Sequence, residues 1–217
     1  MPAIFDFTAL NLIGDLSYVP QLLLIVTGQI FAILNPISVL PTFLSITEEM
    51  DPSERHRVVR NSSATVLIIA LALAIGGNFI LSLFSVGIPG LQIGGGVLLM
   101  VIAAEMLGGL PRTKSLDSSD EIAVVPIATP LLVGPGTMTT IIVLSASVPI
   151  LVLILSILTV TTLTYLILRY SEILVKILGS NGTRALGRFM TIIIAAFAAQ
   201  LIYAGLSEWL KGWGLIS

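Results

Sequence analysis

The sequence predicts an all-α, polytopic membrane protein, and its composition and charge distribution carry that prediction. Only 10% of the 217 residues are charged, against about 25% in soluble domains, and the mean hydropathy is +1.06. Four stretches, 17–47, 61–110, 122–168 and 189–207, contain a single side chain that is charged at neutral pH, Glu105. Apolar runs longer than about 18 residues are typical of membrane spans. We therefore expect a single transmembrane domain over residues 1–217.

Turn-forming residues divide these stretches into six spans. The second stretch is interrupted by Gly87, Pro89 and Gly90, and the third near Pro149. The first stretch has 31 residues, more than the roughly 20 that cross a bilayer, so it contains a span and an additional segment. The expected spans lie near 17–41, 61–85, 89–110, 122–147, 149–169 and 186–207.

The basic residues predict how the spans are oriented. Cytoplasmic loops carry an excess of Lys and Arg. On one side, the loops after the first, third and fifth spans contain nine basic residues, and on the other side there is only Lys211. We therefore expect both termini outside and three cytoplasmic loops. The nine residues are Arg55, Arg57, Arg60, Arg112, Lys114, Arg169, Lys176, Arg184 and Arg188.

Two motif matches predict an internal repeat, with a first half near 17–110, a second half near 122–207 and a cytoplasmic linker near 111–121. Residues 35–41 and 129–135 share the pattern polar residue, Pro, two residues, Val, one residue, Pro, at an offset of 94. Residues 103–107 match 198–202 at an offset of 95. Because each half has three spans, the second half would be inverted relative to the first. Inverted repeats recur in transporters, although duplication for stability alone is the alternative.

The paired prolines predict that the first helix of each half is broken, near 35–41 and 130–136. Proline removes a backbone donor and clashes with the preceding turn, so new helices would open at Thr42 and Thr137. Their free N–H groups suit a carboxylate, and the carbonyls of the opposing half-helices suit an ammonium group. Packing kinks are the alternative, and each break is either a midplane discontinuity or a re-entrant hairpin. The candidate substrate-binding residues are Asn35, Pro36, Pro41, Thr42, Thr129, Pro130, Gly134, Pro135, Gly136 and Thr137.

Glu105 is a second candidate functional residue, since an ionisable side chain inside an apolar span is a functional hypothesis by default. It would act as a proton coupler, and its counterpart in the repeat is Gln200, which does not titrate. The alternative is a hydrated carboxylate near the surface that pairs with Arg112. Gly90 and Gly94, together with Gly95 and Gly96, predict a small face for close helix packing.

Several classes of protein are excluded by composition. A net charge of −2 without a concentrated basic surface argues against nucleic-acid binding, and no cysteine is available for thiol chemistry. The single histidine, His56, lies in a charged segment that we expect to be a loop, so no metal site is predicted. A lone membrane carboxylate makes no acid/base pair. We expect no enzyme, catalytic residue or cofactor.

The motifs at 35–41, 94–95, 103–107 and 129–136 resemble those of the MarC family of prokaryotic inner-membrane proteins. The resemblance covers nearly the whole chain and implies an inner (plasma) membrane location and transport of small neutral amino acids such as glycine or alanine. We therefore expect a secondary transporter in the lipid bilayer with alternating access about the broken helices. Its substrate would be a small zwitterion, and its coupling ion H⁺ or Na⁺. The alternatives are a channel-like pore and a non-transporting scaffold or sensor.

Overall fold

The computed structural model describes residues 18–108 and 132–215, and every regular element in these ranges is a helix. The expected linker at 111–121 and the start of the fourth span at 122–131 lie outside the described residues. The helices are α1 (Val19–Leu34), α2 (Pro36–Ile46), α3 (Pro52–Leu83), α4 (Ile88–Leu107), α5 (Pro135–Ser147), α6 (Ile150–Arg169) and α7 (Ser171–Gly212).

Five segments of the described chain are long and apolar enough to cross a membrane, and they correspond to five of the six expected spans. They are Val19–Ile46, Pro52–Leu83, Ile88–Leu107, Ile150–Arg169 and Asn181–Gly212. The last begins after Gly179, where a left-handed φ of 67° bends α7. In the fourth expected span, the structure describes α5, which has 13 residues. The all-helical membrane fold is thus confirmed.

The charged segment that follows Asp51 is helical, so its expected loop conformation is wrong. Helix α3 begins at Pro52 and includes Glu54 and His56. Proline is favoured at the first helical position, where no N–H is needed, and the Glu54 carboxylate accepts a hydrogen bond from the Asp51 N–H at 3.4 Å. These local features extend the helix about two turns beyond its apolar part. His56 is nevertheless exposed, as expected.

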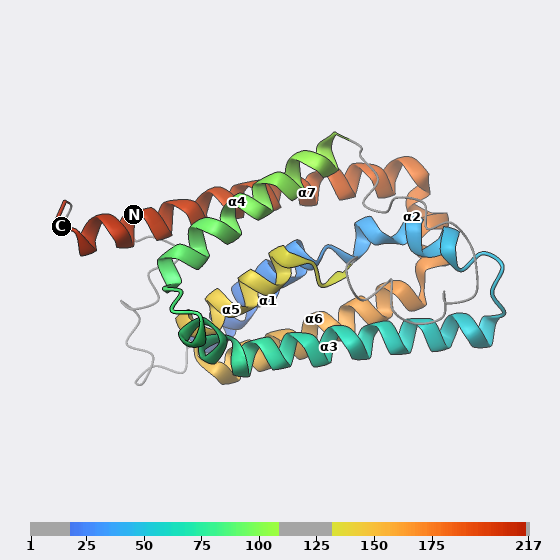
Figure 1. Ribbon diagram of the computed structural model, residues 1–217. Helices are drawn as coiled ribbons and strands as arrows, with labels where there is room; N and C mark the ends of the chain where they lie inside the picture. Colours follow the sequence, from blue (N-terminus) through green and yellow to red (C-terminus); the bar gives the residue numbers. More distant parts are fainter. Residues whose placement is uncertain (1–17, 109–131, 216–217) are drawn as a thin grey trace.

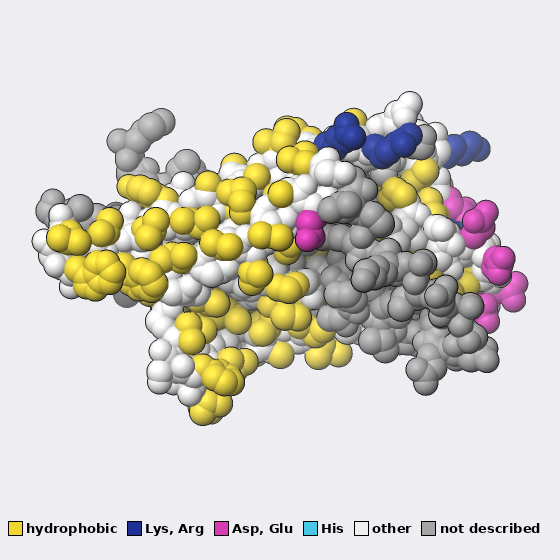
Figure 2. Space-filling model, turned by 45° about the horizontal axis from the view of Figure 1, so that its top comes forward, with side chains coloured by type: hydrophobic (Ala, Val, Ile, Leu, Met, Phe, Trp, Pro, Cys, Tyr) yellow, Lys and Arg dark blue, Asp and Glu magenta, His cyan; other side chains and the backbone are white. Residues whose placement is uncertain are grey.

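The helices form an elongated bundle in which successive spans run in opposite directions (Figure 1). The α2–α3 loop and the α6–α7 junction lie at one end, which we call the charged end. The α3–α4 and α5–α6 connections lie toward the other. Figure 2 shows the Lys and Arg side chains gathered at the charged end and hydrophobic side chains over much of the remaining surface. This segregation fits a bundle whose apolar middle faces lipid.

Helix α5 lies at the centre of the bundle. It packs against α1, α3, α4 and α6, and its residues from Gly136 to Leu144 are buried apart from Met138. Small residues bring the neighbouring backbones close. A Cβ at Gly95 of α4 would lie 1.9 Å from Thr139 Cγ2 of α5, and a Cβ at Gly205 of α7 would lie 2.6 Å from the Pro89 carbonyl oxygen. The sequence prediction that the glycines at 94–96 form a packing face is confirmed for Gly95 and Gly96, whereas Gly94 is exposed.

Candidate functional site

The first helix is interrupted at one residue, Asn35. It adopts the left-handed conformation, with φ 46° and ψ 58°, between the end of α1 and the start of α2. Its N–H donates to the Phe31 carbonyl at 2.9 Å. Its Oδ1 accepts from the Ser38 N–H at 3.4 Å. Asn35 is 1% exposed, so this break lies inside the protein.

The break is shorter than the sequence predicts. Helix α2 opens at Pro36 rather than at Thr42, and Pro41 lies within the helix on an exposed face. Pro36 fits because the first helical position requires no N–H group, whereas Pro41 leaves the Ile37 carbonyl without its usual donor. The helix continues through Pro41 despite this loss. Thr42 is half-buried, nearly two turns into the helix.

The second break places the start of α5 beside the first. Gly134 is extended, with φ −83° and ψ 177°, and α5 opens at Pro135 rather than at Thr137. Gly136 and Thr137 are buried, and the Thr137 hydroxyl donates to the Leu132 carbonyl at 3.3 Å. Thr129 and Pro130 lie outside the described residues.

The two breaks meet near the middle of the molecule (Figure 1). Helix α2 runs from its break toward the charged end, and α5 runs from its break in the opposite direction, so both helix N-termini face the centre. A cavity of about 10 Å³ lies between the halves. It is lined by Ile33 of α1, Leu99 and Ile102 of α4, Leu132, Gly134, Gly136 and Thr137 at the second break, and Ile194 of α7.

Polar groups around the first break are left without partners among the described residues. The Asn35 Nδ2 and Ser38 Oγ atoms are buried and form no hydrogen bond there. By contrast, the hydroxyls of Thr139 and Thr140 on α5 donate to carbonyls of their own helix, at 2.9 and 2.8 Å. A buried polar group without a partner is costly, so Asn35 and Ser38 leave unused hydrogen-bonding capacity at the first break.

Glu105 and Gln200 lie outside this cavity. Glu105 is exposed on α4 and Gln200 is half-buried on α7. The neighbouring Met106 sulfur accepts a hydrogen bond from the Thr191 hydroxyl at 3.9 Å, which places Glu105 about one turn from the level of Arg188.

Sequence reasoning missed Ser38 and the apolar lining of the cavity. Ser38 could have been found, because it stands at the third position of a helix that opens at Pro36, where a side chain lies next to the free N–H groups. Ile33, Leu99 and Ile194 carry no such pattern. They resemble any other buried apolar residue, and only the packing of three helices brings them together.

Comparisons with known proteins identify the family. The family model described as MarC family integral membrane protein matches residues 21–210. The chain belongs to the MarC family. Its relatives include the UPF0056 membrane protein MJ1677 of Methanocaldococcus jannaschii, which is 35% identical over 86% of this chain and 96% of the relative. Membrane protein PYRAB13050 of Pyrococcus abyssi is 32% identical over 82% and 90%.

A further MarC-type relative, the inner membrane protein YhgN of Escherichia coli, is 29% identical over 83% of this chain and 93% of its own. No solved structure matches the chain. The family membership confirms the resemblance seen in the motifs and the integral membrane character.

Proposed function

We propose that the protein is a secondary transporter that moves a small neutral amino acid, or a similarly small zwitterion, through a site between the two breaks. Two observations carry the proposal: a cavity lies at the N-terminus of α5, and at the buried first break the Asn35 amide nitrogen has no hydrogen-bond partner among the described residues. Transporters commonly place substrate sites between repeats at such helix ends.

The chemistry of the breaks suits a carboxylate. The first N–H groups of a helix have no partner in the helix, and the N-terminus carries a partial positive charge. In α5, the first main-chain bond runs from the Met138 N–H to the Gly134 carbonyl at 3.1 Å. The N–H groups of Gly136 and Thr137 therefore face out of the helix end, toward the cavity. The C-terminal carbonyls of α1 would face the ammonium group.

The packing of the helices supports an inverted repeat in which the two halves exchange roles. Helix α4 of the first half packs on α5, as α7 of the second half packs on α2. Pro41 and Pro135, which match at an offset of 94, are both exposed. Such a pair of similar halves gives two arrangements of nearly equal energy, which alternating access requires.

The size of the cavity favours a carrier over a permanently open pore. A volume of about 10 Å³ accommodates about one water molecule, so an amino acid enters only when the helices separate.

We propose H⁺ or Na⁺ as the coupling ion, with Glu105 as the candidate proton carrier, and the inner membrane as the location. A non-transporting scaffold or sensor is the second candidate, which requires no ligand at the breaks.

Ligand binding to the purified protein in detergent tests the proposal. We expect glycine and alanine to raise the melting temperature saturably, while ethanolamine, which lacks the carboxylate, and acetate, which lacks the ammonium group, do not. Asn35→Gly should weaken glycine binding, because it removes the buried amide but suits the backbone. The matched control Asn78→Ala alters an exposed amide on α3 and should leave binding unchanged. Equal effects of glycine, ethanolamine and acetate would contradict the proposal.

A further inference from the structure

A second and larger pocket lies at the charged end, away from the breaks. Its volume is about 360 Å³. It is bordered by the α2–α3 loop, the start of α3 and the junction of α6 with α7. Its lining includes Arg55, His56, Leu168, Arg169, Ser171 and Glu172. The transport hypothesis assigns no role to this pocket.

Arg55 joins two sides of the pocket and retains an unused donor. Its guanidinium pairs with the Glu172 carboxylate and lies 5.7 Å from the centre of the Phe43 ring. The Arg55 Nε atom is buried and has no hydrogen-bond partner among the described residues. A guanidinium N–H that is buried without an acceptor is costly, so this atom points to an anion or a water in the pocket.

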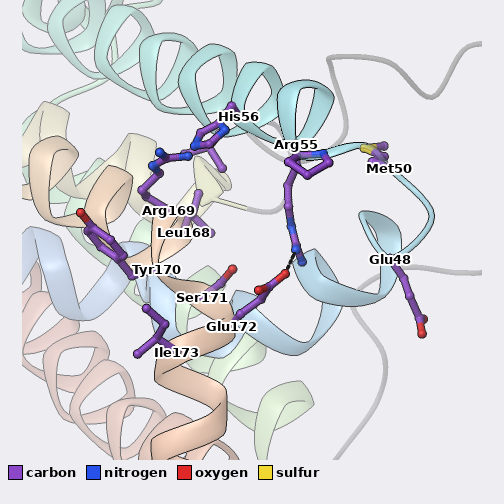
Figure 3. Close-up of a pocket in the computed structure, with 12 residues that line it drawn as sticks. Glu48, Met50, Arg55, His56, Leu168, Arg169, Tyr170, Ser171, Glu172 and Ile173 are labelled. Carbon is purple, nitrogen blue, oxygen red and sulfur yellow. Dashed lines mark hydrogen bonds and ion pairs between the residues drawn. The ribbon is translucent and has the colours of Figure 1, made fainter.

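His56 and Arg169 supply a second basic group in the same pocket. Figure 3 shows the His56 ring and the Arg169 guanidinium side by side, while Glu172 points to Arg55 and Glu48 points away from the basic pair. Within the described residues, Arg169 forms no ion pair. Because Arg55 neutralises Glu172, the part of the pocket near His56 has an excess of positive charge.

The helix lengths place this pocket at the depth of the lipid headgroups. Helix α6 has 20 residues, which span about 30 Å, the thickness of the hydrocarbon core, and Arg169 is its last residue. His56 precedes the apolar part of α3, which starts at residue 61, by just over one turn. Tyr170 and Ile173 beside the pocket are exposed, at 52% and 56%, and suit contact with the membrane interface.

We propose that this pocket binds the phosphate group of an anionic ligand, through Arg169, His56 and the free Nε–H of Arg55. Arginine is suited to phosphate because its planar donors form charge-assisted hydrogen bonds with the phosphate oxygens. Basic pockets between membrane helices at this depth bind lipid headgroups. The same chemistry would also hold a soluble phosphate ester, and the two sources are separable by experiment.

The test measures binding to the purified, full-length protein in detergent. Native mass spectrometry counts bound phosphatidylglycerol and phosphatidylcholine, and calorimetry titrates inorganic phosphate and sn-glycerol 3-phosphate. We expect Arg169→Gln to weaken binding by about tenfold or more, as expected for lost charge-assisted contacts, and His56→Gln to weaken it by less. Arg57→Gln is the matched control, because it removes one charge from an exposed position beside His56 that does not line the pocket.

The outcomes distinguish the sources and the proposal itself. Selective loss of phosphatidylglycerol in Arg169→Gln identifies a lipid headgroup, and selective loss of glycerol 3-phosphate or phosphate binding identifies a soluble ligand. Either result supports the proposal. It is overturned if none of these probes binds in a way that depends on Arg169 and His56, or if Arg57→Gln weakens binding as much as Arg169→Gln does. Neither assay depends on transport activity.

Discussion

At the first break, Asn35 provides both the backbone conformation that ends α1 and the side chain that caps α2. Its left-handed φ of 46° ends α1, and its carboxamide oxygen caps α2. Its amide nitrogen is buried and has no hydrogen-bond partner in the part of the chain that the structure describes. Sequence reasoning located this break because Pro36 and Pro41 both interrupt helical hydrogen bonding. It could not choose between them, because a proline is compatible with a first helical position and also with a kinked interior. The tertiary packing of α2 decides that α2 opens at Pro36.

Substitutions at Asn35 should separate backbone strain from side-chain chemistry. We expect Asn35→Ala to be less stable than Asn35→Gly by about 1 kcal/mol or more, because a Cβ disfavours the left-handed conformation and glycine does not. Asn35→Gly should stay within a few tenths of a kcal/mol of the wild type, since glycine is nearly as good a helix cap. Unfolding of both variants in detergent, followed by tryptophan fluorescence, checks this. An alanine variant as stable as the glycine variant would show that the left-handed backbone is unstrained.

At the scale of the helices, close packing depends on individual glycines. The sequence predicts a small-residue face at 94–96, but a run of three glycines does not say which of them face a neighbour. The structure turns Gly95 toward Thr139 of α5, whereas a Cβ at Gly94 would have no neighbouring atom within 4 Å. The charge pattern also gave a wrong prediction for the segment with Glu54 and His56. Its charged residues suggested a loop, but helix α3 begins before the apolar part of the chain.

The adjacent glycines provide a matched pair of variants. Gly95→Ala should destabilise the protein by about 1–3 kcal/mol, the usual cost of overpacking, because the new Cβ would clash with Thr139. Gly94→Ala should be neutral or slightly stabilising, since alanine is the better helix former. Thermal melting of both variants in detergent measures the difference, and Thr139→Ala should partly rescue Gly95→Ala. If the two glycine variants melt alike, α4 and α5 do not pack as described.

For the whole molecule, the distribution of basic residues predicts that the charged end faces the cytoplasm. Seven of the eight basic residues in the described ranges lie on segments at the charged end, and Lys211 lies at the other. Composition and turn-forming residues were sufficient to predict the membrane class and five of the six expected spans, which correspond to long apolar helices in the described ranges. They could not predict the juxtaposition of the two breaks or the pocket beside Arg55. Both depend on contacts between segments more than 90 residues apart.

Cysteine labelling tests the orientation directly, because the chain contains no cysteine of its own. We expect a cysteine in place of Ser53, at the charged end, to react with a membrane-impermeant maleimide only after the cells are opened. A cysteine in place of Val86, in the α3–α4 connection, should react in intact cells. The excess of basic residues at the charged end is the physical reason. The reverse labelling pattern would show that the termini face the cytoplasm.

The most direct test of the central claim is counterflow of labelled glycine and alanine in proteoliposomes of the purified protein, with Asn35→Gly and a Pro36 and Pro130 double replacement as comparisons. We predict saturable uptake that depends on unlabelled amino acid inside the vesicles and is reduced in both variants. Uptake without counterflow would indicate a pore. No uptake of these amino acids or of other small zwitterions by well-folded protein would contradict the transport proposal and favour the scaffold or sensor.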